Sequence, residues 1–171
     1  MWSSRSSDES LLVEAKKLEK NLLNFFWRQG VSLSEGEDLV QETYLRLWNY
    51  RSRYEPTAKL STFLFTIARQ VRIDALRRQT RREAREEAWE RDRADAPQPT
   101  KMAGDDVRWA LGRLPSAMRE VVELGILQDL PYAEVAEILG IPVGTVKSRM
   151  FNALKRLKEI FDDEGSGRNA G

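Results

Sequence analysis

Apolar side chains recur at helical spacing along almost the whole chain. The first stripe predicts a single helix that ends near Gly30, because glycine suits the left-handed conformation at a helix C-terminus. A second helix is predicted to begin near Ser34, and a third follows the loop 51–59. Shorter stripes continue between residues 107 and 161, and no strand pattern of useful length is present, so the sequence predicts an all-α fold. The members of the first stripe are Leu11, Ala15, Leu18, Leu22 and Phe25.

A segment without any apolar stripe, Ala-Asp-Ala-Pro-Gln-Pro-Thr, divides the chain. Two prolines in so short a stretch are typical of an extended linker. We therefore expect two small helical domains joined by a flexible linker, followed by a disordered tail. The expected boundaries are 8–90 and 104–162 for the domains, 91–103 for the linker and 163–171 for the tail.

The composition excludes several classes of chemistry. The 171 residues include no cysteine and no histidine. Disulfides, zinc ribbons, thiol nucleophiles and imidazole bases are therefore excluded, which leaves carboxylates, Lys, Ser or Tyr to any enzyme. We expect no cofactor, no metal and no enzyme activity. No apolar run approaches the ~20 residues of a membrane span. The first ten residues lack the apolar core of a signal peptide, so we expect a cytoplasmic protein without membrane insertion.

A helix-turn-helix pattern is the strongest local signal. Ala136, Gly140 and Val146 stand four and six residues apart, as in a helix-turn-helix. The small Ala136 lets the second helix approach the first, Gly140 can adopt the left-handed conformation of the turn, and Val146 packs into the core and fixes the angle of the second helix. Five cations and no acid lie between residues 147 and 158. A helical hairpin with a solvated basic face is the plainer alternative, and the spacing makes it less favoured. The predicted DNA-reading residues are Thr145, Lys147, Ser148, Arg149, Asn152 and Arg156.

Two segments of opposite charge stand out in the first half of the chain. Acids cluster at the start of the second helix, where they suit the helix dipole; a divalent metal bridging Asp38 and Glu42 is a less favoured alternative. Six arginines then follow between residues 69 and 82, after an aromatic-rich segment. Cations beside aromatic rings suit DNA strands that are being opened. For Phe63 a core role is favoured, and for Tyr54 both roles stay open.

Four segments resemble the sigma factors of bacterial RNA polymerase. The sequence EDLVQETYLRLW at 37–48 resembles their second conserved region, and LSTFLFTIAR at 60–69 with DALRR at 74–78 resembles the stretch that melts and reads the minus-ten element. The sequence LGIPVGTVKSR at 139–149 resembles the minus-thirty-five reader of the extracytoplasmic-function (ECF) group. The four segments occur in the family's order.

The resemblance implies a region-two domain at 8–90 and a region-four domain at 104–162. Core RNA polymerase would be the partner, through the clamp helices of its largest subunit and its flap tip, with promoter DNA as the ligand and an anti-sigma factor as regulator. The residues implied for docking on core polymerase are Asp38, Gln41, Glu42 and Leu45. Those implied for minus-ten recognition are Tyr54, Lys59, Gln70, Arg72, Arg77 and Arg78.

The sequence departs from the family pattern at three positions. Gln70 stands where asparagine is frequent, which bears on the preferred flipped base. Asp129 replaces a frequent glycine before the helix-turn-helix, and aspartate tolerates the left-handed conformation. Pro131 replaces the usual serine cap and is accepted in a first helical turn.

Two other functions remain as alternatives at this point. A free-standing helix-turn-helix repressor or activator would bind duplex DNA alone, and a carboxylate-metal nuclease would use Asp38, Glu42 and Asp74. We also expect the two domains to attract each other without polymerase, because the first presents an acidic face and an arginine face and the second a basic reading face. In that expectation, the DNA-binding faces of both domains are masked.

Overall fold

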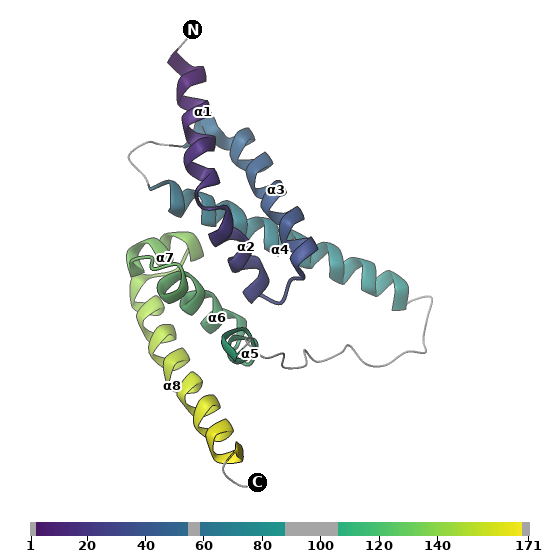
Figure 1. Ribbon diagram of the computed structural model, residues 1–171, viewed down its shortest axis with the longest axis vertical. Coiled ribbons are helices and arrows are strands. Elements are labelled where there is room, and N and C mark those ends of the chain that lie inside the picture. The colour runs from purple at the N-terminus through teal and green to yellow at the C-terminus, as the bar shows by residue number, and fades with distance from the viewer. Residues whose placement is uncertain (1–2, 55–58, 88–105, 169–171) are drawn as a thin grey trace.

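The computed structural model describes residues 3–54, 59–87 and 106–168, and every regular element in these ranges is helical, which confirms the all-α prediction (Figure 1). We call residues 3–87 the N-terminal domain and residues 106–168 the C-terminal domain. The N-terminal domain comprises α1 (Ser3–Lys16), α2 (Glu19–Arg28), α3 (Leu33–Tyr50), the 3-10 turn η1 (Arg51–Arg53) and α4 (Leu60–Glu87). The C-terminal domain comprises α5 (Asp106–Gly112), α6 (Ser116–Val122), the π-turn η2 (Glu123–Leu127), α7 (Tyr132–Leu139) and α8 (Val143–Arg168).

The first apolar stripe belongs to two helices, so the prediction of a single helix is wrong. α1 ends at Lys16 and α2 begins at Glu19, and a tight turn joins them in which the Leu18 amide donates to the Ala15 carbonyl at 3.0 Å. Ala15 and Leu22 are nevertheless both fully buried. The stripe identified the core-facing side chains, and it could not reveal a break of two residues that leaves them facing the same core.

The turn between α2 and α3 follows local sequence rules. Gly30 has a φ of 87°, as expected for a residue that ends a helix. α3 begins two residues earlier than predicted, because Ser32 rather than Ser34 is the N-cap. The Glu35 amide donates to the Ser32 hydroxyl at 3.3 Å, and the Ser32 amide donates to the Glu35 carboxylate at 3.4 Å. This reciprocal capping box fixes the start of α3.

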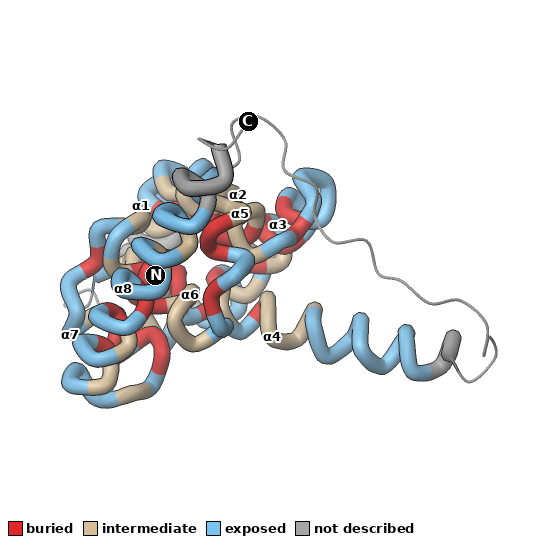
Figure 2. The backbone as a smooth tube through the Cα atoms, turned by 90° about the horizontal axis from the view of Figure 1, so that it is seen from below, coloured by how far each residue is buried: buried red, intermediate tan, exposed pale blue. Residues whose placement is uncertain are grey.

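α4 is the central helix of the N-terminal domain. Its buried face packs against α3, α2 and α1, and Phe65 meets Phe25 edge-to-face at 5.5 Å between ring centroids. A polar bridge adds to the apolar contacts: Arg46 on α3 donates to Asp74 on α4 at 2.7 Å. The second half of α4 projects away from the body and is exposed (Figure 2).

The C-terminal domain places α8 across α6 and α7. Gly125 lies against α8: a Cβ atom at that position would lie 2.8 Å from the Cε of Met150, so the end of that side chain would have to shift. α8 continues to Arg168, so the tail expected to be disordered from 163 onward begins inside a helix. The linker predicted at 91–103 lies outside the described residues. Among the described helices, none is both long and apolar enough to cross a membrane.

The two domains pack against each other, and their buried apolar side chains form one continuous cluster. α4 contacts α7, and α2 contacts α5. Glu123, the first residue of η2, also faces α2 and is only 1% exposed. It accepts hydrogen bonds from Arg28 of the N-terminal domain at 3.3 Å and from Gln128 at 3.0 Å. Burial raises the pKa of Glu123, and the charge of Arg28 opposes that rise.

We expect replacement of Arg28 by methionine to destabilise the intact chain in a pH-dependent way. The loss at pH 8 should be about 2 kcal/mol, below the ~3–5 kcal/mol of a fully buried pair, because Arg28 keeps some contact with water. Without Arg28, the pKa of Glu123 in the native state should rise further above its pKa in the unfolded state. Between these two pKa values the native state holds a proton that the unfolded state has released, so stability falls as pH rises through this range. Urea unfolding between pH 5 and pH 8 measures this dependence.

The matched control is Arg28→Met in a Glu123→Gln background. The glutamine side chain carries no charge, so the same arginine replacement should cost little and its cost should not vary with pH. An equal cost in both backgrounds would contradict the pairing of Arg28 with Glu123.

Candidate nucleic-acid interface

The helix-turn-helix geometry predicted from the sequence is present in α7 and α8. Val146 is fully buried and Ala136 is 7% exposed, so both lie in the angle between the helices. Gly140 has a φ of 65°, and the Ile141 amide donates to the Ala136 carbonyl at 3.1 Å. This bond closes the C-terminal turn of α7 in the way that a left-handed glycine permits. The three packing residues therefore do what their spacing predicted.

The turn before α7 tolerates its two departures from the family pattern. Asp129 adopts a φ of 54°, so aspartate takes the left-handed conformation as expected. Pro131 is the N-cap of α7 and makes no side-chain cap. Its carbonyl instead accepts from the amides of Glu134 at 2.9 Å and Val135 at 3.0 Å. The start of α7 is thus defined by the backbone alone.

The face of α8 opposite its buried side chains is available to a ligand. Thr145 and Arg149 are half-buried at the rim of this face, and Arg149 makes no ion pair with any described residue. The Ser148 hydroxyl donates to the Thr145 carbonyl at 3.1 Å. A helix surface with cations and small polar groups fits the major groove of DNA. The exposed members of the predicted set are Lys147, Ser148, Asn152 and Arg156.

One face of α3 carries the candidates for docking on a protein partner. Asp38 and Gln41 are exposed, and Leu45 is 62% exposed. Trp48 extends the same face at helical spacing and is 40% exposed, although it was not among the predicted docking residues. Its ring stacks on the Arg51 guanidinium at 4.1 Å. A large aromatic left at the surface is the signal that could have found it.

Glu42 differs from the other three docking candidates because it already has a partner. Its carboxylate accepts from Arg46 at 2.8 Å, and Arg46 also binds Asp74. Arg46 lowers the pKa of Asp74 through this hydrogen bond. The nuclease alternative needed Glu42 and Asp74 to share a metal, but an arginine bridges them. The described residues contain no group of three or more carboxylates suited to a metal ion.

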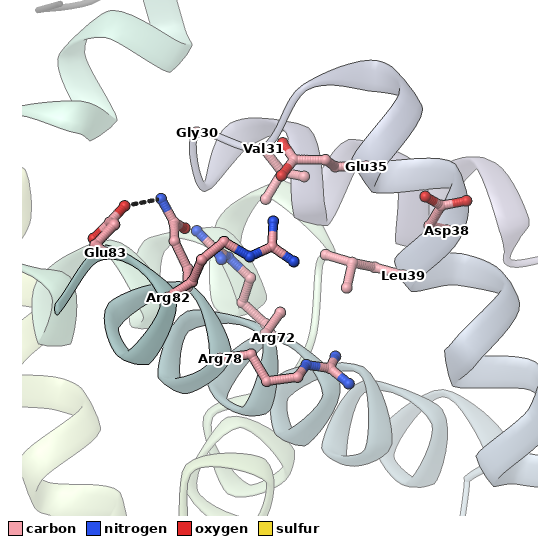
Figure 3. A pocket seen from close by; sticks show the side chains of 11 residues that line it. Gly30, Val31, Glu35, Asp38, Leu39, Arg72, Arg78, Arg82 and Glu83 are labelled. Atoms are coloured by element: carbon pink, nitrogen blue, oxygen red, sulfur yellow. Dashed lines mark hydrogen bonds between the residues drawn. The ribbon is translucent and has the colours of Figure 1, made fainter. Parts of the chain in front are cut away.

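The minus-ten candidates fall on two different faces of α4. Gln70 lines a cleft of about 390 Å³ between the domains, together with Phe63 and the end of α7. Arg72 and Arg78 instead line a cleft of about 620 Å³ between α4 and the start of α3, which Asp38 also lines (Figure 3). A single short stretch of DNA strand therefore cannot lie on all the predicted residues in this arrangement.

Arg72 is the candidate that is most enclosed. Its guanidinium donates to the Gln29 carbonyl at 3.4 Å, and its Nε is buried without a partner among the described residues. Burial lowers the pKa of Arg72. Arg77, by contrast, is exposed and lies 4.0 Å from Asp74. The structure thus links Arg72 to the packing of the α2–α3 turn against α4.

Tyr54 and Lys59 flank the short stretch 55–58, which is outside the described residues. The Tyr54 ring lies 5.4 Å from that of Phe63, which is half-buried against the core. Lys59 forms an ion pair with Glu134 of the C-terminal domain at 2.5 Å. These residues therefore lie beside Gln70 and the domain interface rather than beside Arg72.

The expectation that the DNA-binding faces of both domains are masked is wrong for the reading face of α8. The structure leaves that face of α8 exposed and brings α7 onto α4. The charges that meet are basic on the N-terminal domain and acidic on the C-terminal domain, as at Lys59 and Glu134.

Comparison with known proteins agrees with this geometry. Residues 16–82 match the family described as Sigma-70 region 2, and residues 105–157 match Sigma-70, region 4. The ECF RNA polymerase sigma factor RpoE of Cereibacter sphaeroides is 34% identical over 160 residues, which cover 89% of this chain and 87% of that protein. The ECF RNA polymerase sigma factor EcfG of Rhodopseudomonas palustris is 32% identical over 143 residues, covering 80% and 79%.

Solved structures show the same two-domain architecture. The sigma factor RpoE of Bartonella quintana, solved in complex with the anti-sigma factor NepR, superposes with a TM-score of 0.74 at 27% identity and covers 90% of this chain and 98% of that one. CnrH, solved with the cytosolic domain of CnrY, shares the fold with a TM-score of 0.69 at 22% identity over 91% and 89% of the two chains. The chain belongs to the ECF family of RNA polymerase sigma factors.

The left-handed turn of the helix-turn-helix gives a direct stability test. Gly140→Ala should lower the free energy of unfolding by about 1–2 kcal/mol, because a Cβ atom is disfavoured in this conformation. Gly140→Asn should cost less, since asparagine tolerates it. Gly144→Ala is the matched control: Gly144 is exposed near the start of α8, with nothing near its would-be Cβ, so alanine should be neutral or stabilising. Equal losses at both glycines in urea unfolding would contradict this assignment.

Proposed function

We propose that this ECF sigma factor binds core RNA polymerase through α3 and directs it to promoters that it reads with α8 and the first half of α4. The observation that carries the proposal is that one chain presents two exposed faces of different chemistry. The α8 face is cationic and polar, and the α3 face combines an acid with large apolar side chains. A free-standing repressor would have a use for the first face only.

The α3 face suits a protein helix pair. Asp38 and Gln41 supply polar contacts, and Leu45 and Trp48 supply apolar area that is otherwise costly to leave in water. We assign this surface to the clamp helices of the largest polymerase subunit, by resemblance to the family. Glu42 supports the same surface indirectly, because its bond with Arg46 holds α3 on α4.

The C-terminal domain offers a second contact for polymerase. Phe151 is 71% exposed and Leu154 is 47% exposed on α8, one turn apart. We assign this apolar pair to the polymerase flap tip, which the resemblance places on this domain. Phe151 lies one helical turn beyond Lys147, so the flap-tip contact would border the DNA face on the side of Lys147.

We also propose control by an anti-sigma factor. The support is the similar sigma factor of Bartonella quintana, which was solved in complex with the anti-sigma factor NepR. The apolar residues exposed on α3 and α8 would suit such a partner, which would compete with polymerase for them. The role in transcription initiation requires no catalysis by this chain, and the site of action would be the cytoplasm, where core polymerase works.

Asp38→Lys should weaken binding to core polymerase by at least about tenfold, because it places a cation where a basic partner surface would approach. The fold should be unaffected, since exposed charges rarely change stability by more than ~0.5 kcal/mol. Glu37→Lys is the matched control, because it makes the same change at the neighbouring exposed position. Biolayer interferometry with immobilised core measures both. Equal binding by the two variants would place the docking surface elsewhere.

Arg149→Ala and Arg156→Ala should separate base reading from phosphate contact. Duplexes selected from a random library by the holoenzyme provide the specific minus-thirty-five sequence, and scrambled duplexes provide the comparison. Arg149→Ala should cost about 1–3 kcal/mol on the selected duplex and much less on the scrambled one. Arg156→Ala should weaken both equally and flatten the salt dependence. Identical losses on both duplexes for Arg149→Ala would remove it from base recognition.

A further inference from the structure

Three ion pairs between the described parts of the two domains share one polarity. Each takes the cation from the N-terminal domain and the acid from the C-terminal domain. Arg28 pairs with Glu123, Lys59 with Glu134, and Arg69 with Glu120. The last two pairs lie on the element that the proposed function assigns to the melted promoter strand. Apolar packing between the domains does not explain why all three ion pairs have the same polarity.

Glu134 of α7 binds the start of α4 with both carboxylate oxygens. One oxygen lies 2.5 Å from the Lys59 ammonium, and the other accepts from the Thr62 hydroxyl at 2.9 Å. Thr62 is only 3% exposed, so its hydroxyl has little access to water in this arrangement. An ammonium and a hydroxyl that converge on two oxygens of one anion would serve a phosphate group equally well.

Glu120 of α6 binds Arg69 in a second, two-pronged contact. The Nε of Arg69 donates to one carboxylate oxygen at 2.8 Å, and its terminal nitrogen donates to the other at 3.4 Å. The planar guanidinium fork has the geometry that recognises carboxylate or phosphate. Arg69 stands two helical turns beyond Thr62, about 10 Å along α4. The two carboxylates are therefore spaced along α4 like two anionic groups on a single extended ligand.

The surroundings indicate which extended anion this is. The Tyr54 ring lies 5.4 Å from that of Phe63, and Phe63, Arg69 and Gln70 line the cleft that the end of α7 closes. Aromatic rings and amides between cations suit unstacked bases, whereas a folded acidic peptide would not need them. A single DNA strand offers phosphates for the cations and bases for the rings.

We propose that Lys59, Thr62 and Arg69 bind phosphates of the promoter strand, and that Glu134 and Glu120 occupy these positions within the free chain. The two carboxylates act as internal competitors, so the strand can bind only when the C-terminal domain leaves α4. The identity of the strand as promoter DNA rests on the proposed function. The reading face of α8 stays exposed in the closed chain, so the competition affects the minus-ten contact and not the minus-thirty-five contact.

Neutralising both competitors should strengthen binding to single-stranded DNA. The full-length Glu120→Gln/Glu134→Gln variant should bind a fluorescent oligo(dT) 15-mer at least about fivefold more tightly than the parent in an anisotropy titration, which is a typical coupling between linked sites. The matched control is Asp129→Asn/Glu159→Gln, which removes two exposed acids of the same domain that have no ion pair among the described residues. Equal binding by both double variants would overturn the proposal.

The gain must also depend on the proposed phosphate ligands. Adding Lys59→Gln and Arg69→Gln to the Glu120→Gln/Glu134→Gln variant should abolish the increase in affinity. A retained increase would place the strand elsewhere and overturn the proposal.

Opening can be observed directly, because the chain has no cysteine of its own. Ser34→Cys and Lys158→Cys place two dyes on exposed positions of the two domains. Energy transfer should fall in the Glu120→Gln/Glu134→Gln variant and on addition of oligo(dT) to the parent. Unchanged transfer in both cases would overturn the competition.

Transcription assays separate this proposal from the proposed function. A chain that opens and binds oligo(dT) as expected but does not support promoter-specific transcription with core polymerase would overturn the promoter role. The competition between carboxylates and a DNA strand would still stand. A chain that supports transcription but gains no affinity in the double variant would overturn the competition alone.

Discussion

Burial of the first half of α4 on two sides holds this molecule together. Leu64, Ala68 and Val71 are fully buried, and the helix meets α3 on one side and α7 on the other. Both domains therefore gain apolar contact from the same short stretch, and their cores merge into one cluster. The stretch is also the one that resembles the minus-ten reader of sigma factors. Under the proposed function, domain packing and strand recognition therefore use the same stretch of α4.

Local features were readily predicted from the sequence, because they depend on neighbours along the chain. The spacing of Ala136, Gly140 and Val146 contains the whole geometry of the helix-turn-helix, including its left-handed turn. The break between α1 and α2 could not be predicted in this way. A stripe of apolar residues shows the direction of each side chain and not the path of the backbone. The start of α3 was missed by two residues because two serines, Ser32 and Ser34, could each have capped the helix.

The candidate sites show the same limit at longer range. Asp38, Gln41 and Leu45 share a face of one helix, so the sequence could group them, whereas Trp48, which extends that face, was not among the docking candidates. Arg72 and Gln70 are two residues apart and lie on different faces of α4. Charge runs could not reveal which domain supplies the acid at the interface, because pairing depends on the tertiary arrangement of both helices.

The buried carboxylate of Glu123 also bears on how the chain is made. Its partner Arg28 precedes it by 95 residues, so the ribosome releases α2 well before the C-terminal domain. The N-terminal domain then presents Arg28 to η2, so the charge of Glu123 is compensated when η2 packs against α2. Without that surface, the C-terminal domain would have to bury this acid with the neutral hydrogen bond of Gln128 in place of the charge of Arg28. Order of synthesis thus favours the closed chain as the first product of translation.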